Sequence, residues 1–196
     1  MRSVWMALAI ASVGTAAAAG PFGLEMGMPA SKLQVIGKSQ APNTFRIAPP
    51  SPDAEFTAYV VVASPKDGVC KVFAYGKIHE NDADGATIRT VFNSVKADLA
   101  KQYGASGDFD FVDGTSPWIG RANYAMALRE SHRTLASFWD PSEESTLPSD
   151  ITAIKLEARA ASASGTYVTV AYEFQNFDQC SAEPVRTYRG PSTNAG

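Results

Sequence analysis

The chain has 196 residues, of which 45% are hydrophobic and 19% are charged, and its formal net charge at pH 7 is −3. This length and apolar content allow a buried core, and the many aromatic and β-branched residues exclude global disorder. The 17 basic residues are outnumbered by 20 acidic ones and form no basic patch, so nucleic acid is not expected as a partner.

Residues 1–19 have the three parts of a secretory signal peptide. A charged start at Arg2 precedes an apolar run over residues 4–11, and small residues follow, with an A-x-A pattern at Ala17 and Ala19. The run of about ten apolar residues is too short to cross a bilayer, which takes about 20. We therefore expect cleavage after Ala19 or one residue earlier, and export to the periplasm or the extracellular space without a membrane anchor.

Export decides how the two cysteines are interpreted, because an isolated pair in an oxidising compartment is most simply a disulfide. Cys70 falls on the more apolar face of a predicted strand, and Cys180 follows the last predicted strand. A bond between them would be largely buried and would close a loop of roughly 100 residues, worth about 4–5 kcal/mol by chain entropy. Two free thiols are the alternative.

The first half of the predicted mature chain is rich in strand signals. Residues 29–36 favour a short helix, because proline begins the segment and Gly37 follows it. Residues 44–47 favour a short strand. Residues 55–63 and 69–78 alternate in side-chain polarity and are joined by turn residues, so we predict a β-hairpin.

The strongest helix signal covers residues 86–103. Its apolar residues recur at the spacing of one helical face: Ile88, Phe92, Val95, Leu99 and Tyr103. Asp82 and Asp84 precede it and are predicted to cap its N-terminus. A calcium-binding loop is the alternative, but its twelfth position would be Val91, which cannot ligate the ion.

The second half repeats the mixture of helix and strand signals. Residues 105–117 are rich in Gly and Asp and are predicted to form a connector. A second helix is expected over about residues 118–130. Residues 133–139 are interpreted as a strand, with an extension of that helix as the alternative. Residues 151–160 and 166–174 alternate in polarity and predict another hairpin.

These elements predict an α+β fold with antiparallel sheet(s) and two main helices. They can be grouped as two halves, each a helix followed by a three-stranded meander, packed as one domain over residues 20–183. Residues 184–196 form a polar tail that is expected to fray. One face of the last hairpin is predicted to be a solvated sheet surface, with charged residues at Lys155, Glu157, Arg159 and Glu173.

Acidic and histidine side chains are the candidates for catalysis. Asp108 and Asp110 share one side of an extended segment, with Cα atoms about 6–7 Å apart, and such a separation suits glycoside hydrolysis. Most such pairs are turn or surface acids, because a catalytic pKa needs burial or a close partner. His79 precedes several acidic residues, and His132 lies in a predicted turn. The chain contains no G-x-S-x-G elbow, and neither histidine has a partner four residues on. No cofactor or metal is therefore expected.

Aromatic residues are the candidates for a binding surface, because such residues are enriched at interface hot spots. They are Trp118, Phe138 and Trp139, which could line such a surface, although aromatic residues more often pack in the core. Without a catalytic motif, we expect an exported, non-enzymatic module that binds a protein or an envelope component. A hydrolase using Asp108, Asp110 or His79 is a second hypothesis. A small-molecule carrier is a third, and it needs an apolar pocket between helices and sheet.

Overall fold

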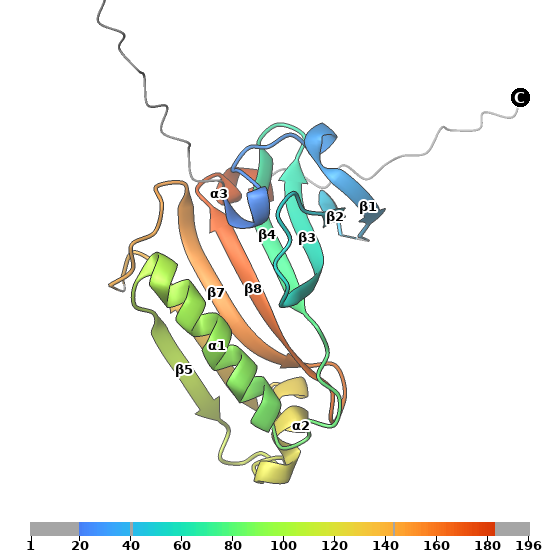
Figure 1. The fold of residues 1–196 in the computed structure, drawn as a ribbon, viewed down its shortest axis with the longest axis vertical. Helices are drawn as coiled ribbons and strands as arrows, with labels where there is room; N and C mark the ends of the chain where they lie inside the picture. The colour runs from blue at the N-terminus through green and yellow to red at the C-terminus, as the bar shows by residue number, and fades with distance from the viewer. Residues whose placement is uncertain (1–19, 40, 143, 183–196) are drawn as a thin grey trace, which may run out of the picture.

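The computed structural model describes residues 20–182 except residues 40 and 143. The predicted signal peptide and the predicted C-terminal tail lie outside the described residues. Within this part, the strands form one 8-stranded antiparallel sheet in the order β1-β2-β3-β4-β8-β7-β6-β5 (Figure 1). The sheet therefore consists of two four-stranded meanders, which meet where β4 pairs with β8.

The first meander follows two short 3₁₀ turns, Pro21–Gly23 and Ala30–Lys32. Its strands are β1 (Gln34–Lys38), β2 (Thr44–Ala48), β3 (Phe56–Ser64) and β4 (Gly68–Gly76). The predicted strand over residues 44–47 and the predicted hairpin are confirmed. The predicted helix over residues 29–36 is wrong, because Val35 lies in β1 and pairs with Ile47 of β2. A helix this short is marginal alone, and the strand pairing overrides its local end signals.

The second meander contains β5 (Gly107–Val112), β6 (Arg133–Trp139), β7 (Ile151–Ala160) and β8 (Thr166–Phe174). The helices are α1 (Ala86–Tyr103) before β5, α2 (Tyr124–Arg129) between β5 and β6, and α3 (Phe177–Ala182) after β8. A 3₁₀ turn, Arg121–Asn123, leads into α2.

The α+β class with an antiparallel sheet is confirmed, and α1 begins and ends where the periodicity predicts. The strand at residues 133–139 is also confirmed, against the alternative of a longer helix. Other details of the prediction are wrong. The predicted connector contains β5, the second helix is shorter than expected, and α3 is an additional helix. Each half contributes four strands rather than three, so the grouping of a helix with three strands does not describe the sheet.

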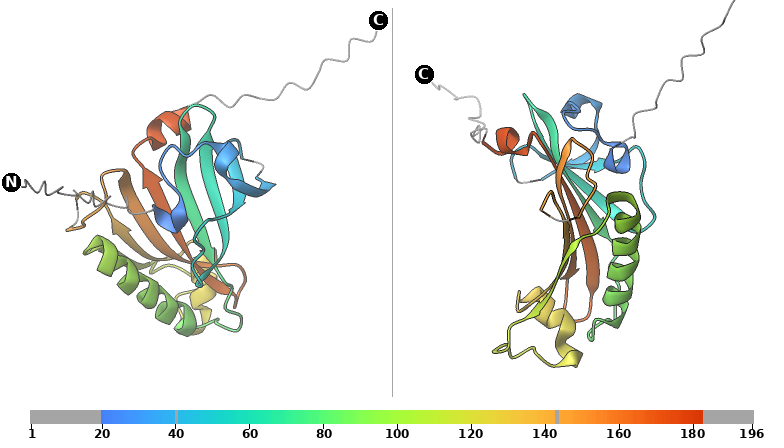
Figure 2. Two further views of the ribbon diagram at one scale, coloured as in Figure 1. Left: turned by 45° about the horizontal axis from the view of Figure 1, so that its top comes forward. Right: turned by 90° about the vertical axis from the view of Figure 1, so that its left-hand side faces the viewer.

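Helix α1 covers one face of the second meander, where it contacts β7 and β8. Figure 2 shows it lying along one side of the sheet. Its apolar stripe is buried there, including Ile88, Phe92 and Leu99. Within the described residues, no helix is long and apolar enough to cross a membrane.

The start of α1 is fixed by the buried carboxylate of Asp82. It accepts hydrogen bonds from the backbone N–H groups of Thr87 at 2.8 Å and Ile88 at 2.9 Å, and from the Thr166 hydroxyl at 2.6 Å. Burial opposes ionisation of Asp82, but these hydrogen bonds outweigh it and lower its pKa. The predicted capping role is confirmed, and the bond to Thr166 also ties α1 to β8.

The Cys70–Cys180 disulfide is present, as predicted. Cys70 lies on β4 and Cys180 on α3, and both are buried. The bond therefore links the first meander to the helix that follows the second, across a sequence separation of 110.

Candidate binding surface at the edge of the open sheet face

The face of the sheet opposite α1 is called here the open face. In the side view of Figure 2, α1 lies on one side of the sheet, while α3 lies on the other, at one end. Residues that alternate with the core residues point to the open face. They include Lys71, Phe73 and Tyr75 on β4, Lys155, Glu157 and Arg159 on β7, Thr169, Ala171 and Glu173 on β8, and Phe138 on β6.

The charged side chains predicted to lie on a solvated surface are on the open face, and they are paired. Lys71 Nζ lies 2.8 Å from Glu173 Oε2, and Lys155 Nζ lies 3.0 Å from Glu157 Oε2. Lys71 also sits 4.4 Å from the ring centre of Phe177 on α3. The centre of the open face is therefore occupied by matched charges rather than by an unsatisfied group.

The edge of the open face at β5 is different, because it carries exposed aromatic rings. Phe109 and Phe111 are 55% and 63% exposed. The Phe109 ring meets the ring of Phe138 on β6 edge-to-face, with centroids 5.4 Å apart. These three residues are called here the edge patch. Strand β5 is the last in the sheet, so within the part of the chain that the structure describes it pairs with β6 alone, and Figure 1 shows it at the outer margin beside α1.

The other side of β5, toward α1, carries Asp108 and Asp110. Asp108 contacts Lys96 of α1 and accepts a 2.7 Å hydrogen bond from Ser137 of β6. Burial opposes ionisation of Asp108, but these bonds outweigh it and lower its pKa. Asp110 accepts a 2.5 Å hydrogen bond from Arg133. The two carboxylates share one side, as the extended segment predicts, but each is bound by a cation.

The three aromatic candidates lie in different places. Phe138 belongs to the edge patch. Trp139 has no exposed surface, and its Nε1 donates a 3.0 Å hydrogen bond to the carbonyl of Gly104, so it packs in the core and does not contribute to a surface. The physical reason is that successive strand residues point to opposite faces. Trp118 is half-buried in the loop after β5, where its backbone N–H donates to Ser116 Oγ.

The histidines do not join the β5 carboxylates. The backbone of His79 pairs with Thr166 at the start of β8, which two intervening strands separate from β5. His79 Nε2 lies 3.8 Å from Glu55 Oε1, and neither of these buried atoms has a hydrogen-bond partner among the described residues. His132 lies in a turn, as predicted, with Nδ1 3.4 Å from Asp113 Oδ2. A catalytic site built from His79 with Asp108 or Asp110 is not assembled.

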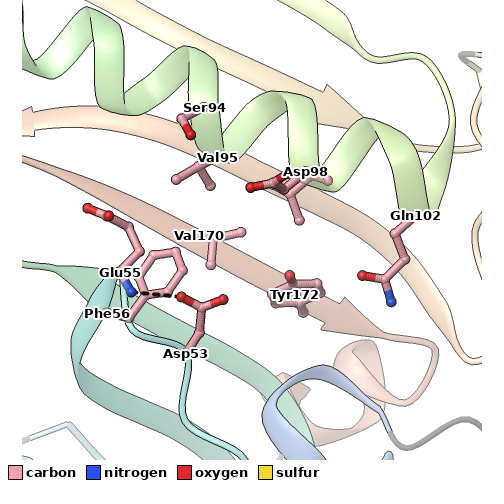
Figure 3. A pocket seen from close by; sticks show the side chains of 10 residues that line it. Asp53, Glu55, Phe56, Ser94, Val95, Asp98, Gln102, Val170 and Tyr172 are labelled. Carbon is pink, nitrogen blue, oxygen red and sulfur yellow. Dashed lines mark hydrogen bonds between the residues drawn. The ribbon is translucent and has the colours of Figure 1, made fainter.

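A cavity of about 180 Å³ lies between α1, β8 and the segment leading into β3 (Figure 3). Its lining includes apolar side chains from the core, together with three carboxylates, Asp53, Glu55 and Asp98. The Tyr172 side chain is also there, and burial raises its pKa. In the part of the chain that the structure describes, no cluster of three or more His, Cys, Asp or Glu side chains could hold a metal.

Sequence reasoning missed the two phenylalanines of β5. The signal was present in the alternation Asp108-Phe109-Asp110-Phe111, a period of two that is typical of a strand with different faces. Flanking Gly107 and Gly114 favour a loop instead. Among known protein families, curated proteins and solved structures, comparison with this chain finds no match.

Proposed function

We propose that the chain is a non-enzymatic binding module that holds a protein partner at the edge patch, Phe109, Phe111 and Phe138. The supporting observation is the exposure of Phe109 and Phe111, at 55% and 63%, side by side on one edge strand. Burying a phenylalanine side chain fully is worth about 1.5–3 kcal/mol. A single exposed apolar residue is ordinary, whereas adjacent exposed rings are typical of an interaction site.

The scaffold around the edge patch favours binding with little reorganisation. Phe109 and Phe111 lie on a strand that pairs with β6 over its whole length. Lys96 holds the opposite side of that strand to α1 through Asp108. A patch whose backbone is already fixed loses little conformational entropy when a partner binds.

Two other functions have weaker support. A carrier for an apolar molecule would use the cavity beneath α1, but the lining of this cavity includes three carboxylates, Asp53, Glu55 and Asp98. A hydrolase would use Asp108 and Asp110, yet both carboxylates are engaged by Lys96 and Arg133.

We also propose that the module works outside the cytoplasm. The sequence of residues 1–19 supports export, and so does the buried Cys70–Cys180 disulfide, because such bonds form and persist mainly in oxidising compartments.

The binding proposal is tested by substituting the exposed rings. The Phe109→Ser/Phe111→Ser variant is expected to retain at least about tenfold less of the partner than the wild type, because hot-spot rings typically contribute more than about 1 kcal/mol each. Wild type and variant are immobilised, exposed to an envelope extract of the source cells, and compared by quantitative mass spectrometry.

The matched control is Ile78→Ser, which removes a 52% exposed apolar side chain away from the edge patch. It is expected to retain the same proteins as the wild type. Thermal unfolding checks that each variant is folded. Equal recovery of the same proteins by the double variant would contradict the proposal, and so would repeated failure of the wild type to retain any protein.

A further inference from the structure

We infer that the partner is bound as an extended peptide that adds to the outer edge of β5. The apolar residues of this peptide lie on the same face of the sheet as Phe109 and Phe111. They alternate along the peptide with Lys or Arg residues, which lie on the same face as Asp108 and Asp110. This inference rests on the proposed function, because it specifies what the edge patch holds.

The outer edge of β5 is available for strand addition. Among the described residues, Gly107–Val112 pairs with β6 and with no other strand. In an edge strand, alternate residues direct their backbone N–H and C=O groups away from the sheet. An extended peptide that binds there gains main-chain hydrogen bonds, while its alternate side chains provide specificity.

The two sides of β5 differ in chemistry. Phe109 and Phe111 point to the open face, whereas the side chains of Asp108 and Asp110, 49% and 56% exposed, point to the side of α1. Directly opposed residues on neighbouring strands have Cβ atoms about 4.5–5.5 Å apart. An added strand therefore places one set of its side chains against two rings, and the other set against two carboxylates.

Asp110 has capacity for a further cation, whereas Asp108 already accepts bonds on both oxygens, from Lys96, Ser106 and Ser137. Asp110 receives a hydrogen bond from Arg133 on one oxygen, Oδ1. An ionised carboxylate offers about four acceptor positions on its two oxygens. Because Asp110 is more than half exposed, a basic side chain on an added strand can reach it, whereas an acidic one meets like charge.

The same charge pattern disfavours a second copy of the chain as the occupant. If two β5 strands pair in antiparallel fashion over at least five of their 6 residues with their rings on one face, Phe109 lies opposite either Phe109 or Phe111 of the copy. The first register places Asp108 opposite Asp110, and the second places Asp110 opposite Asp110. Like charges directly opposite one another are destabilising, so an alternating apolar and basic strand fits this edge better.

The test uses two synthetic peptides, one of alternating Lys and Val and one with Glu in place of every Lys. They are titrated into the folded chain at low salt, and binding is followed by calorimetry. The Lys peptide is expected to bind about tenfold more tightly than the Glu peptide.

The Asp108→Asn/Asp110→Asn variant is expected to reduce this preference for the Lys peptide to less than about threefold. Asp98→Asn, whose carboxylate on α1 pairs with Lys101, is the matched control and should keep the preference.

Hydrogen exchange locates the bound peptide. The Lys peptide is expected to protect backbone amides of β5, while the other edge strand, β1, stays unchanged. Equal binding of the two peptides, no binding of either up to about 1 mM, or no protection of β5 would overturn the inference. So would a concentration-dependent dimer that protects β5. If the Phe109→Ser/Phe111→Ser variant still loses its natural partner in those cases, the proposed function stands and only the strand-addition mode fails.

Discussion

Replacing both Cys70 and Cys180 by alanine is expected to lower the free energy of unfolding by about 2–5 kcal/mol. The disulfide closes a sequence separation of 110, so it removes much conformational freedom from the unfolded chain. It also attaches α3, a helix of 6 residues that is too short to be stable alone, to β4. Urea unfolding of the wild type and the double variant measures the difference.

The control for this prediction is the wild type after reduction, whose stability should approach that of the double alanine variant. Mass spectrometry with thiol alkylation, before and after reduction, verifies the bond in the exported protein. A loss of stability below about 1 kcal/mol, or two thiols that alkylate without reduction, would contradict the structural role given to the disulfide.

Asp82→Ala is expected to lower the free energy of unfolding by about 2–4 kcal/mol. The substitution removes the acceptor for two N–H groups at the start of α1, and it leaves the buried hydroxyl of Thr166 without this partner. Asp84→Ala is the matched control, because Asp84 makes only exposed contacts, a 3.1 Å hydrogen bond from the N–H of Ala86 and a 3.8 Å ion pair with Arg121. It should cost less than about 1 kcal/mol. Equal losses for the two variants would show that Asp82 is not the residue that anchors α1.

The contribution of Asp82 to stability is expected to depend on pH. Its pKa in the folded state lies below the ordinary aspartate value of about 3.9, which applies to the unfolded chain. The stabilisation is therefore fully present above that value and is lost as the pH falls through the lower, folded pKa. Asp82→Asn does not titrate, so its stability difference from the wild type should be constant above about pH 5 and should shrink below about pH 4. A difference that grows on acidification would contradict the assignment.

The elements that could be predicted from the sequence are those whose signals are local. Helix α1 has a stripe with helical spacing and an acidic cap, and both lie within about 20 residues of each other. The hairpins of β3 with β4 and of β7 with β8 combine alternating polarity with turn residues. In these segments, local preference and the packed structure agree.

The parts that could not be predicted depend on distant pairing. Strand β1 is stabilised by β2, and β5 by β6 and by the contact of Asp108 with Lys96. The order of the strands decides that β5 lies at an edge, and this order follows from the pairing of β4 with β8. Sequence alone therefore does not show that Phe109 and Phe111 are exposed at the end of a sheet.

The choice between Phe138 and Trp139 illustrates the same limit within one strand. Alternation shows that the two rings point to opposite faces, but it does not show which face α1 covers. In the structure, Trp139 is buried in the core, and Phe138 lies on the open face. The candidate surface identified from sequence thus contributed one residue, Phe138, to the edge patch.

Photo-crosslinking from the edge patch tests the central claim most directly. A benzoylphenylalanine at position 111 replaces an exposed ring by a similar but reactive one, and the same residue at position 78 serves as the control. After irradiation in an envelope extract of the source cells, position 111 is predicted to give a discrete crosslinked protein that position 78 does not give. Crosslinks of equal yield from both positions, or none from position 111, would contradict a binding role for the edge patch.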